Sequence, residues 1–275
     1  MKKYEFTGET KEIGFWSKTV TLHRIRAIRD FVDVKAGDLG GWIEKEENLS
    51  HEGDCWVYDD AVVRDNAVVR DNAVVRDNAV VRNNAVVRDD AMVIDHAVVC
   101  HNAMVTDHAN VWCCAMVRQN AIVRDDAAIY GNAIIRDHAA VCDNAKVSGN
   151  AVILENAIVG DNAVVRDGAK VCDDATILDY AIVRGNAKVC GNAEIFSINH
   201  ILTIGPIGSR NDFTTFYRDK DGEITVSCGC FLGKIDKFLE KVSETHGDSK
   251  HALVYRAAVE LAKLQIDLTD REKEK

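Results

Sequence analysis

Apolar residues recur with a fixed six-residue period through residues 55–198. Alanine occupies every sixth position from Ala61 to Ala193, twenty-three times without an insertion. Two residues after each alanine comes valine or isoleucine, from Val63 to Ile195, and one further rung begins at Cys55. Each rung therefore shows apolar side chains to one side with period two, which predicts a short β-strand.

Two turn residues follow each strand, as in Asp65-Asn66 and Gly149-Asn150. The residue just before each alanine is nearly always Asn, Asp, His or Gly. These types tolerate positive φ, so we expect this residue to form a left-handed corner. Three strands and three corners close a coil of eighteen residues, and twenty-four rungs give about eight parallel coils.

The repeat resembles a known family. The segment Val63-Arg64-Asp65-Asn66-Ala67-Val68 is similar to the hexapeptide repeat of left-handed β-helix proteins. The resemblance implies a left-handed coil with Val63 and Ala67 pointing inward. The flanks Gly37-Asp38-Leu39-Gly40-Gly41-Trp42-Ile43 and Cys228-Gly229-Cys230-Phe231 resemble uncharacterised phage and prophage repeat proteins, some described as acyltransferases.

The fold class expected is all-β, a left-handed parallel β-helix with an N-terminal β cap and a small α+β C-terminal domain. The predicted domains are 1–54 for the cap, 55–198 for the β-helix and 199–275 for the C-terminal domain. A strand is predicted from Thr19 to Arg26 in the cap, since Val20 and Leu22 alternate with polar residues.

The C-terminal residues lose the six-residue period. Residues 214–217 and 223–227 predict a hairpin that turns at Asp221-Gly222. Apolar residues at helical spacing predict two helices, one from Ile235 to Val242 and one from Val254 to Gln265.

Charge and composition narrow the function classes. The net charge is −10, and the repeat carries 13 basic and 20 acidic residues, which argues against nucleic-acid binding. No apolar run approaches the ~20 residues that cross a bilayer, so no membrane association is expected. Nine cysteines without framework spacing predict reduced thiols in a cytoplasmic protein.

Outward positions eighteen residues apart stack into columns, and two faces show apolar columns. The candidate interface residues are Val80, Val98, Met116, Ile134, Val86, Met104, Ile122, Trp112 and Tyr130. We expect these columns to mediate self-association, as a dimer or trimer, or docking of the C-terminal helices. The alternative is that valine serves β propensity alone, with arginine stems covering it.

Arginine fills the other outward position in many rungs, for example at Arg64, Arg82, Arg118 and Arg136. A cationic strip of this kind could receive an anionic ligand or partner. Pairing with the adjacent corner aspartates is the alternative that the sequence favours, because aspartates outnumber arginines in the repeat.

The signals for catalysis and metal binding are weak. His96, His108 and His138 occupy the position before alanine, where conformational tolerance explains them. His101 lies one place earlier and is the only candidate general base, with no evident orienting partner.

The cysteines do not predict a metal site. Cys113-Cys114 and Cys228-Gly229-Cys230 lack zinc-site spacing, so neither a metal nor another cofactor is predicted. Cys172 and Cys190 stack in one column with Cys100. The separation of adjacent coils, ~4.8 Å, would permit a bridge between Cys172 and Cys190 in an oxidising setting, but we interpret them as small strand residues.

One loop carries residue types that bind anions. Gly208, Ser209, Arg210 and Asn211 combine a glycine, a hydroxyl, a guanidinium and an amide, which could cradle a phosphate or carboxylate. A simple turn between strands is the alternative.

The sequence as a whole favours a non-enzymatic scaffold or interaction protein, related to phages or prophages, whose C-terminal domain recognises a partner. One alternative is an acyltransferase that binds coenzyme A between subunits of a trimer. The other is a counter-defence protein that binds a signalling nucleotide near Arg210 or in an intersubunit groove, or blocks a host effector.

Overall fold

The computed structural model describes residues 2–15 and 18–269. Contacts divide the chain into two compact units, Met1–Asp143 and Asn144–Lys275. The fold class is confirmed: the chain is mostly β, with a parallel solenoid in each unit and a small C-terminal domain of a β-sheet and two helices.

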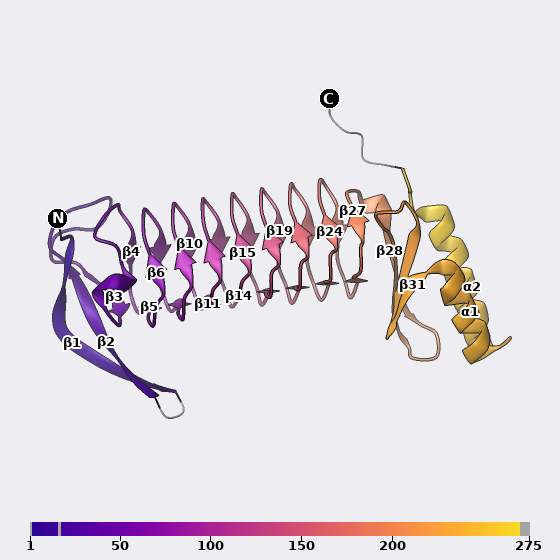
Figure 1. The fold of residues 1–275 in the computed structure, drawn as a ribbon, viewed down its shortest axis with the longest axis horizontal. Coiled ribbons are helices and arrows are strands. Elements are labelled where there is room, and N and C mark those ends of the chain that lie inside the picture. The colour runs from indigo at the N-terminus through magenta and orange to yellow at the C-terminus, as the bar shows by residue number, and fades with distance from the viewer. Residues whose placement is uncertain (1, 16–17, 270–275) are drawn as a thin grey trace. The chain divides into compact units, whose positions relative to one another are not determined.

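In the first unit, short strands of successive coils stack in three parallel sheets (Figure 1). One sheet contains β5 (Val62–Val63), β8 (Val80–Val81), β11 (Val98–His101), β14 (Met116–Gln119) and β17 (Ile134–Ile135). The next contains β4 (Trp56–Val57), β7 (Val74–Val75), β10 (Met92–Val93), β13 (Asn110–Val111) and β16 (Ala128–Ile129). The third contains β6 (Val68–Val69), β9 (Val86–Val87), β12 (Met104–Val105), β15 (Ile122–Val123) and β18 (Ala140–Val141).

The core of this solenoid follows the predicted inward positions. The repeating alanines from Ala61 to Ala139 and the aliphatic residues from Val63 to Val141 are fully buried. Neighbouring coils are joined by backbone hydrogen bonds such as that from the Val80 amide to the Ala97 carbonyl, 2.9 Å. The period-two pattern therefore identified correctly which side chains fill the coil.

The predicted corner position is wrong by one residue. Positive φ occurs two residues before each alanine, as at Asp65 (φ 58°) and Asp71 (φ 61°), and not at the residue just before it. The corner carboxylate also accepts a hydrogen bond from the backbone amide of the equivalent residue on the next coil. The Asn83 amide, for instance, donates to the Asp65 carboxylate at 3.1 Å. An aspartate here thus bonds the coils together as well as tolerating the backbone conformation.

The N-terminal residues add a hairpin and extend the solenoid. β1 (Tyr4–Phe15) and β2 (Lys18–Ala27) pair antiparallel, which confirms the predicted strand and adds one that was not predicted. β3 (Leu39–Ile43) pairs in parallel with β5, and after the 3₁₀ helix η1 (Glu46–Asn48) Leu49 bridges to Val69. Two further rungs therefore precede the repeat.

The solenoid of the second unit also contains three parallel sheets. One sheet contains β20 (Val152–Ile153), β23 (Lys170–Val171) and β26 (Lys188–Val189). Another contains β19 (Lys146–Val147), β22 (Val164–Val165) and β25 (Ile182–Val183), and the third contains β21 (Ile158–Val159), β24 (Thr176–Ile177) and β27 (Glu194–Ile195).

A small α+β domain follows the last coil of this unit. The 3₁₀ helix η2 (Ile198–His200) leads into an antiparallel sheet of β28 (Ile201–Ile207), β29 (Asp212–Arg218), β30 (Ile224–Cys228) and β31 (Phe231–Lys234). The helices α1 (Ile235–His246) and α2 (Lys250–Gln265) lie side by side against this sheet (Figure 1). The predicted hairpin and both helices are confirmed, whereas β28 and β31 were not predicted.

The core of this domain forms where the helices meet the sheet, around Phe216, Val226, Phe238 and Val259. Ser249 caps α2 by accepting a hydrogen bond from the Ala252 amide. None of the helices in the described part of the chain is long and apolar enough to cross a membrane.

Candidate functional site

The predicted ligand-binding loop forms the turn between β28 and β29. Gly208 (φ 72°) and Asn211 (φ 50°) both adopt the left-handed conformation that makes this turn tight. A Cβ atom on Gly208 would lie 1.9 Å from the hydroxyl oxygen of Tyr255 on α2. Glycine is therefore required here, because the turn packs directly on that tyrosine.

This turn forms one wall of a pocket of about 170 Å³ in the C-terminal domain. Ser209 and Arg210 line it, and Gly208 and Asn211 shape the turn behind them. The other lining residues come from β30, β31, α1 and α2: Cys228, Phe231, Phe238, Lys241, Val242, Thr245, His246 and Tyr255. The pocket thus combines an apolar, aromatic part with several polar side chains.

The polar side chains contact one another. The Ser209 hydroxyl lies 3.4 Å from His246 Nε2, and the Cys228 thiol donates to the Tyr255 hydroxyl at 3.9 Å. Burial, with the neighbouring Cys228, raises the pKa of Tyr255 above its usual value. Tyr255 therefore keeps its proton at neutral pH and can act as a hydrogen-bond donor.

Arg210 and Lys241 contribute cationic groups to the lining of the pocket. A Cβ atom on Gly229 would lie 2.6 Å from Arg210 Nη1, so the guanidinium lies against the β30–β31 turn. Among the residues that the structure describes, no carboxylate forms an ion pair with Arg210, whereas Lys241 pairs with Glu244 at 3.2 Å. Arg210 is thus available to bind an anionic group, and a guanidinium can form two parallel hydrogen bonds to a carboxylate or phosphate.

The sequence did not identify His246, Tyr255, Cys228 or Lys241 as members of this site. They come from segments that no motif connects to the loop, and the helix pattern marked only their apolar neighbours. The packing of α1 and α2 on the sheet brings them to Ser209 and Arg210.

His101 is explained by its corner. Its φ of 63° places it in the left-handed position, equivalent to Asp65. Its Nδ1 lies 3.2 Å from the Cys100 sulfur. Burial raises the pKa of the Cys100 thiol, although Arg82 and Arg118 oppose this shift.

The explanation given for His96, His108 and His138 is wrong, because their position is not the one with positive φ. His108 instead lies between carboxylates of the neighbouring coils, 3.8 Å from Asp90 and 3.7 Å from Asp126.

The candidate interface residues stack in the predicted columns and are half-buried. Val80 also packs against a cluster of Val20, Leu22, Trp42 and Val62, so the start of its column is covered by the N-terminal hairpin. Trp112 and Tyr130 stack face to face, with ring centroids 4.7 Å apart.

Most outward arginines of the first unit pair with the adjacent corner aspartate, as the sequence favoured. Examples are Arg64 with Asp65 at 3.0 Å and Arg124 with Asp125 at 2.6 Å. Arg82, in contrast, donates to Asn83 at 3.1 Å.

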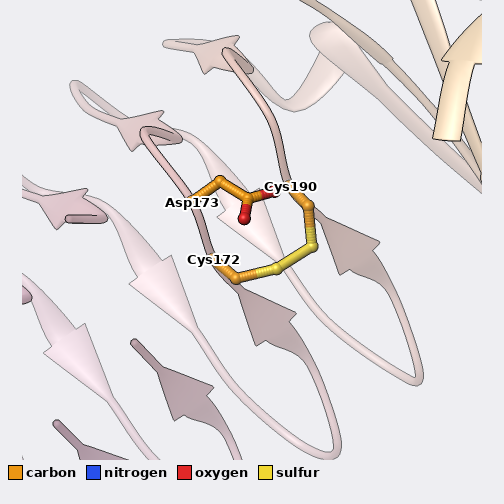
Figure 2. Close-up of side chains that lie close together, drawn as sticks. All are labelled: Cys172, Asp173 and Cys190. Atoms are coloured by element: carbon orange, nitrogen blue, oxygen red, sulfur yellow. A yellow bond between two sulfur atoms is a disulfide. The ribbon is translucent and has the colours of Figure 1, made fainter. Parts of the chain in front are cut away.

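The interpretation of Cys172 and Cys190 as small, reduced strand residues is wrong. They form a disulfide bond, which is the alternative that their column allowed. Figure 2 shows Asp173 beside this bond, a grouping of ligand types that could hold a metal ion. The Asp173 carboxylate, however, accepts the Gly191 amide at 2.6 Å, the same bond that corner aspartates form elsewhere. Its place is therefore explained by the ladder between coils.

A second such group is Asp125, Cys142 and Asp143 in the first unit. Burial and a hydrogen bond to Asp143 raise the pKa of the Cys142 thiol to about 12. The thiol therefore stays protonated at neutral pH and donates its hydrogen bond to the Asp143 carboxylate.

The chain is similar to a curated protein over a short segment. No family model matches the chain. Over 67 residues the chain is 42% identical to the uncharacterized acetyltransferase YdcK of Escherichia coli strain K12, a match that covers 23% of this chain and 21% of that protein. The chain thus matches about a fifth of the length of this curated relative. The parallel solenoid and this relative are consistent with a left-handed β-helix of the hexapeptide-repeat superfamily.

Proposed function

We propose that the chain is a β-solenoid interaction protein whose C-terminal domain binds a small ligand that joins an anionic group to a flat apolar part. The observation that carries this proposal is the pocket that gathers Ser209, Arg210 and His246 around an aromatic wall. Binding sites of this composition use the apolar part for affinity and a few polar groups for orientation.

The two halves of the pocket define the ligand. Arg210, His246 and the hydroxyl of Tyr255 supply hydrogen-bond donors for a phosphate, sulfonate or carboxylate. Phe231 and Phe238 supply ring surfaces for the apolar part.

The solenoid would supply the assembly surface. The columns that include Met116 and Ile122 recur in register from coil to coil, so a second copy could align along them over several coils. Native mass spectrometry tests this part: a dimer or trimer is expected, and Met116→Glu should shift it toward monomer.

A titration with 8-anilinonaphthalene-1-sulfonate tests the pocket, since this probe carries a sulfonate on an aromatic body. Arg210→Ala should weaken binding roughly tenfold, because a charge-assisted hydrogen bond contributes about 1.5–3 kcal/mol. Arg166→Ala in the solenoid is the matched control and should leave the affinity unchanged. Equal affinities for the parent protein and Arg210→Ala would count against the proposal.

Acyl transfer is the second candidate function, supported by the name of the relative and by the contact between Ser209 and His246. A serine hydroxyl beside a histidine is the pair that nucleophilic acyl transfer uses. Calorimetric titration with coenzyme A and a hydrolysis assay with acetyl-coenzyme A test it. Activity lost in both Ser209→Ala and His246→Ala, but kept in His101→Asn, would place the chemistry in the pocket.

Counter-defence through a signalling nucleotide is a narrower form of the same binding proposal. A nucleotide carries both the phosphate that Arg210 would bind and a flat base for the phenylalanines. Titration with cyclic dinucleotides, measured for the parent protein and for Arg210→Ala, tests this narrower form.

A further inference from the structure

Cys172 and Cys190 occupy the same outward position on adjacent coils of the second unit. β23 and β26 pair in parallel with Val171 opposite Val189, and this register brings the two Cα atoms to 4.6 Å. The disulfide therefore joins coils that the backbone ladder already holds together, and it closes a ring of one coil (Figure 2).

Both cysteines are shielded from solvent. Cys172 is 5% exposed and Cys190 is 2% exposed, and they pack in one cluster with Leu154. A thiolate has to reach a sulfur atom along the axis of the bond, so exchange requires local opening of the coil.

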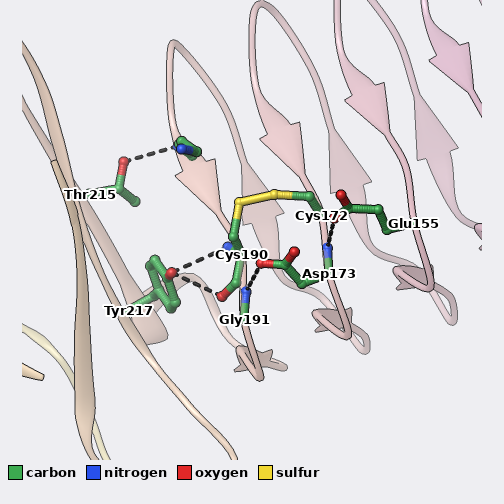
Figure 3. The surroundings of a disulfide bond; sticks show 8 residues. Glu155, Cys172, Asp173, Cys190, Gly191, Thr215 and Tyr217 are labelled. Carbon is green, nitrogen blue, oxygen red and sulfur yellow. Dashed lines mark hydrogen bonds between the residues drawn. A yellow bond between two sulfur atoms is a disulfide. The ribbon is translucent and has the colours of Figure 1, made fainter. Parts of the chain in front are cut away.

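Cys190 also lies where the C-terminal domain meets the end of its sheet. β26 ends this sheet in the second unit, and side chains of β29 bind its free edge (Figure 3). The Tyr217 hydroxyl accepts a hydrogen bond from the Cys190 amide at 3.2 Å and donates one to the Cys190 carbonyl at 3.0 Å. The Thr215 hydroxyl accepts a hydrogen bond from the Lys188 amide at 3.0 Å. The residue that carries the disulfide is thus the residue that β29 holds.

We propose that Cys172 and Cys190 form a thiol–disulfide exchange site that controls how firmly the last coil holds the C-terminal domain. The co-reactant is a low-molecular-weight dithiol. One of its thiolates attacks a sulfur of the pair, breaking the disulfide and forming a mixed disulfide. Its second thiolate then releases the protein, leaving Cys172 and Cys190 as thiols and the co-reactant as a cyclic disulfide.

The first experiment measures coupling through Tyr217. The oxidised protein is treated with dithiothreitol, and reduction is followed by the mass gain of two hydrogen atoms. Tyr217→Phe should be reduced roughly tenfold faster than the parent, because the loss of its hydroxyl favours opening of the last coil. Tyr180→Phe, whose ring is 74% exposed, is the matched control and should be reduced at the parental rate.

The second experiment measures, by amide hydrogen exchange, how the redox state of the disulfide changes the opening of the last coil and of β29. The amides of residues 188–195 and 215–217 should exchange at least roughly tenfold faster in the reduced protein than in the oxidised one. In the double variant Cys172→Ala/Cys190→Ala these rates should not respond to dithiothreitol. The proposal is overturned if the protein, purified under oxidising conditions, contains two free thiols at these positions. It is also overturned if oxidised and reduced protein exchange alike.

Discussion

The hydroxyl group of Tyr217 donates a hydrogen bond to the carbonyl oxygen of Cys190 at 3.0 Å and accepts one from the amide of the same residue at 3.2 Å. One side chain thereby satisfies both polar backbone groups of a residue at the end of the solenoid sheet. An end strand exposes such groups to pairing with other chains, so Tyr217 acts as a cap on this edge.

Removal of this hydroxyl should destabilise the second unit. Tyr217→Phe leaves two buried backbone groups without this partner, which costs roughly 1–3 kcal/mol. Urea denaturation measures the loss, with Tyr180→Phe as the exposed control. A variant as stable as the parent would show that water satisfies the edge equally well.

The two neighbouring positions Ile122 and Val123 should differ sharply. Val123 is fully buried in the coil, whereas Ile122 points outward and is half-buried. Val123→Asp buries an unpaired charge and should cost at least roughly 3–5 kcal/mol. Ile122→Asp stays in contact with water and should cost about 1 kcal/mol. Thermal unfolding checks both, and a larger loss at Ile122 would reverse the assigned register.

Stability of the C-terminal domain should depend on pH through Asp219. This buried carboxylate accepts hydrogen bonds from Lys234 at 2.5 Å and from Thr225 at 2.6 Å. Burial alone would raise the pKa of Asp219, but these bonds outweigh it and lower the pKa. The stabilisation is therefore fully present above the usual aspartate pKa near 4 and is lost as pH falls through the lower folded value.

Replacement of the carboxylate separates this effect from other acid effects. Asp219→Asn should lose on the order of 1–3 kcal/mol at neutral pH. Between pH 5 and 2 the variant should show a shallower decline than the parent protein in denaturant titrations. Parallel declines would mean that other carboxylates set the acid sensitivity.

His101 should be replaceable wherever the backbone conformation is respected. Asparagine tolerates positive φ, so His101→Asn should change stability by no more than about 0.5 kcal/mol. Valine does not, so His101→Val should cost about 1–2 kcal/mol. Thermal unfolding of both variants checks this. Equal losses would show that the contact with Cys100 matters more than the corner.

The sequence by itself determined the solenoid. Strand positions and the inward face of every coil follow from side-chain alternation and the six-residue period, which depend only on backbone geometry along the chain. Ala67 and Val69 are buried because they lie two residues apart on one strand and therefore point to the same, inward side. The hairpin and helices of the C-terminal domain follow from equally local signals.

The corner positions show where local reasoning ends. Both turn residues of a rung, such as Asp65 and Asn66, are types that tolerate a left-handed backbone, so composition does not distinguish them. The hydrogen bond from the Asn83 amide to Asp65 distinguishes the two positions, and this bond exists only when coils stack.

Tertiary structure alone decided the disulfide and the pocket. The repeat places Cys172 and Cys190 in one column on adjacent coils and so permits a bridge, but whether their side chains turn toward each other is decided only in the folded structure. Ser209 and His246 are separated by 37 residues and meet because α1 buries its apolar face on the sheet. Contacts of this kind depend on the packing free energy of the whole domain, which no local pattern encodes.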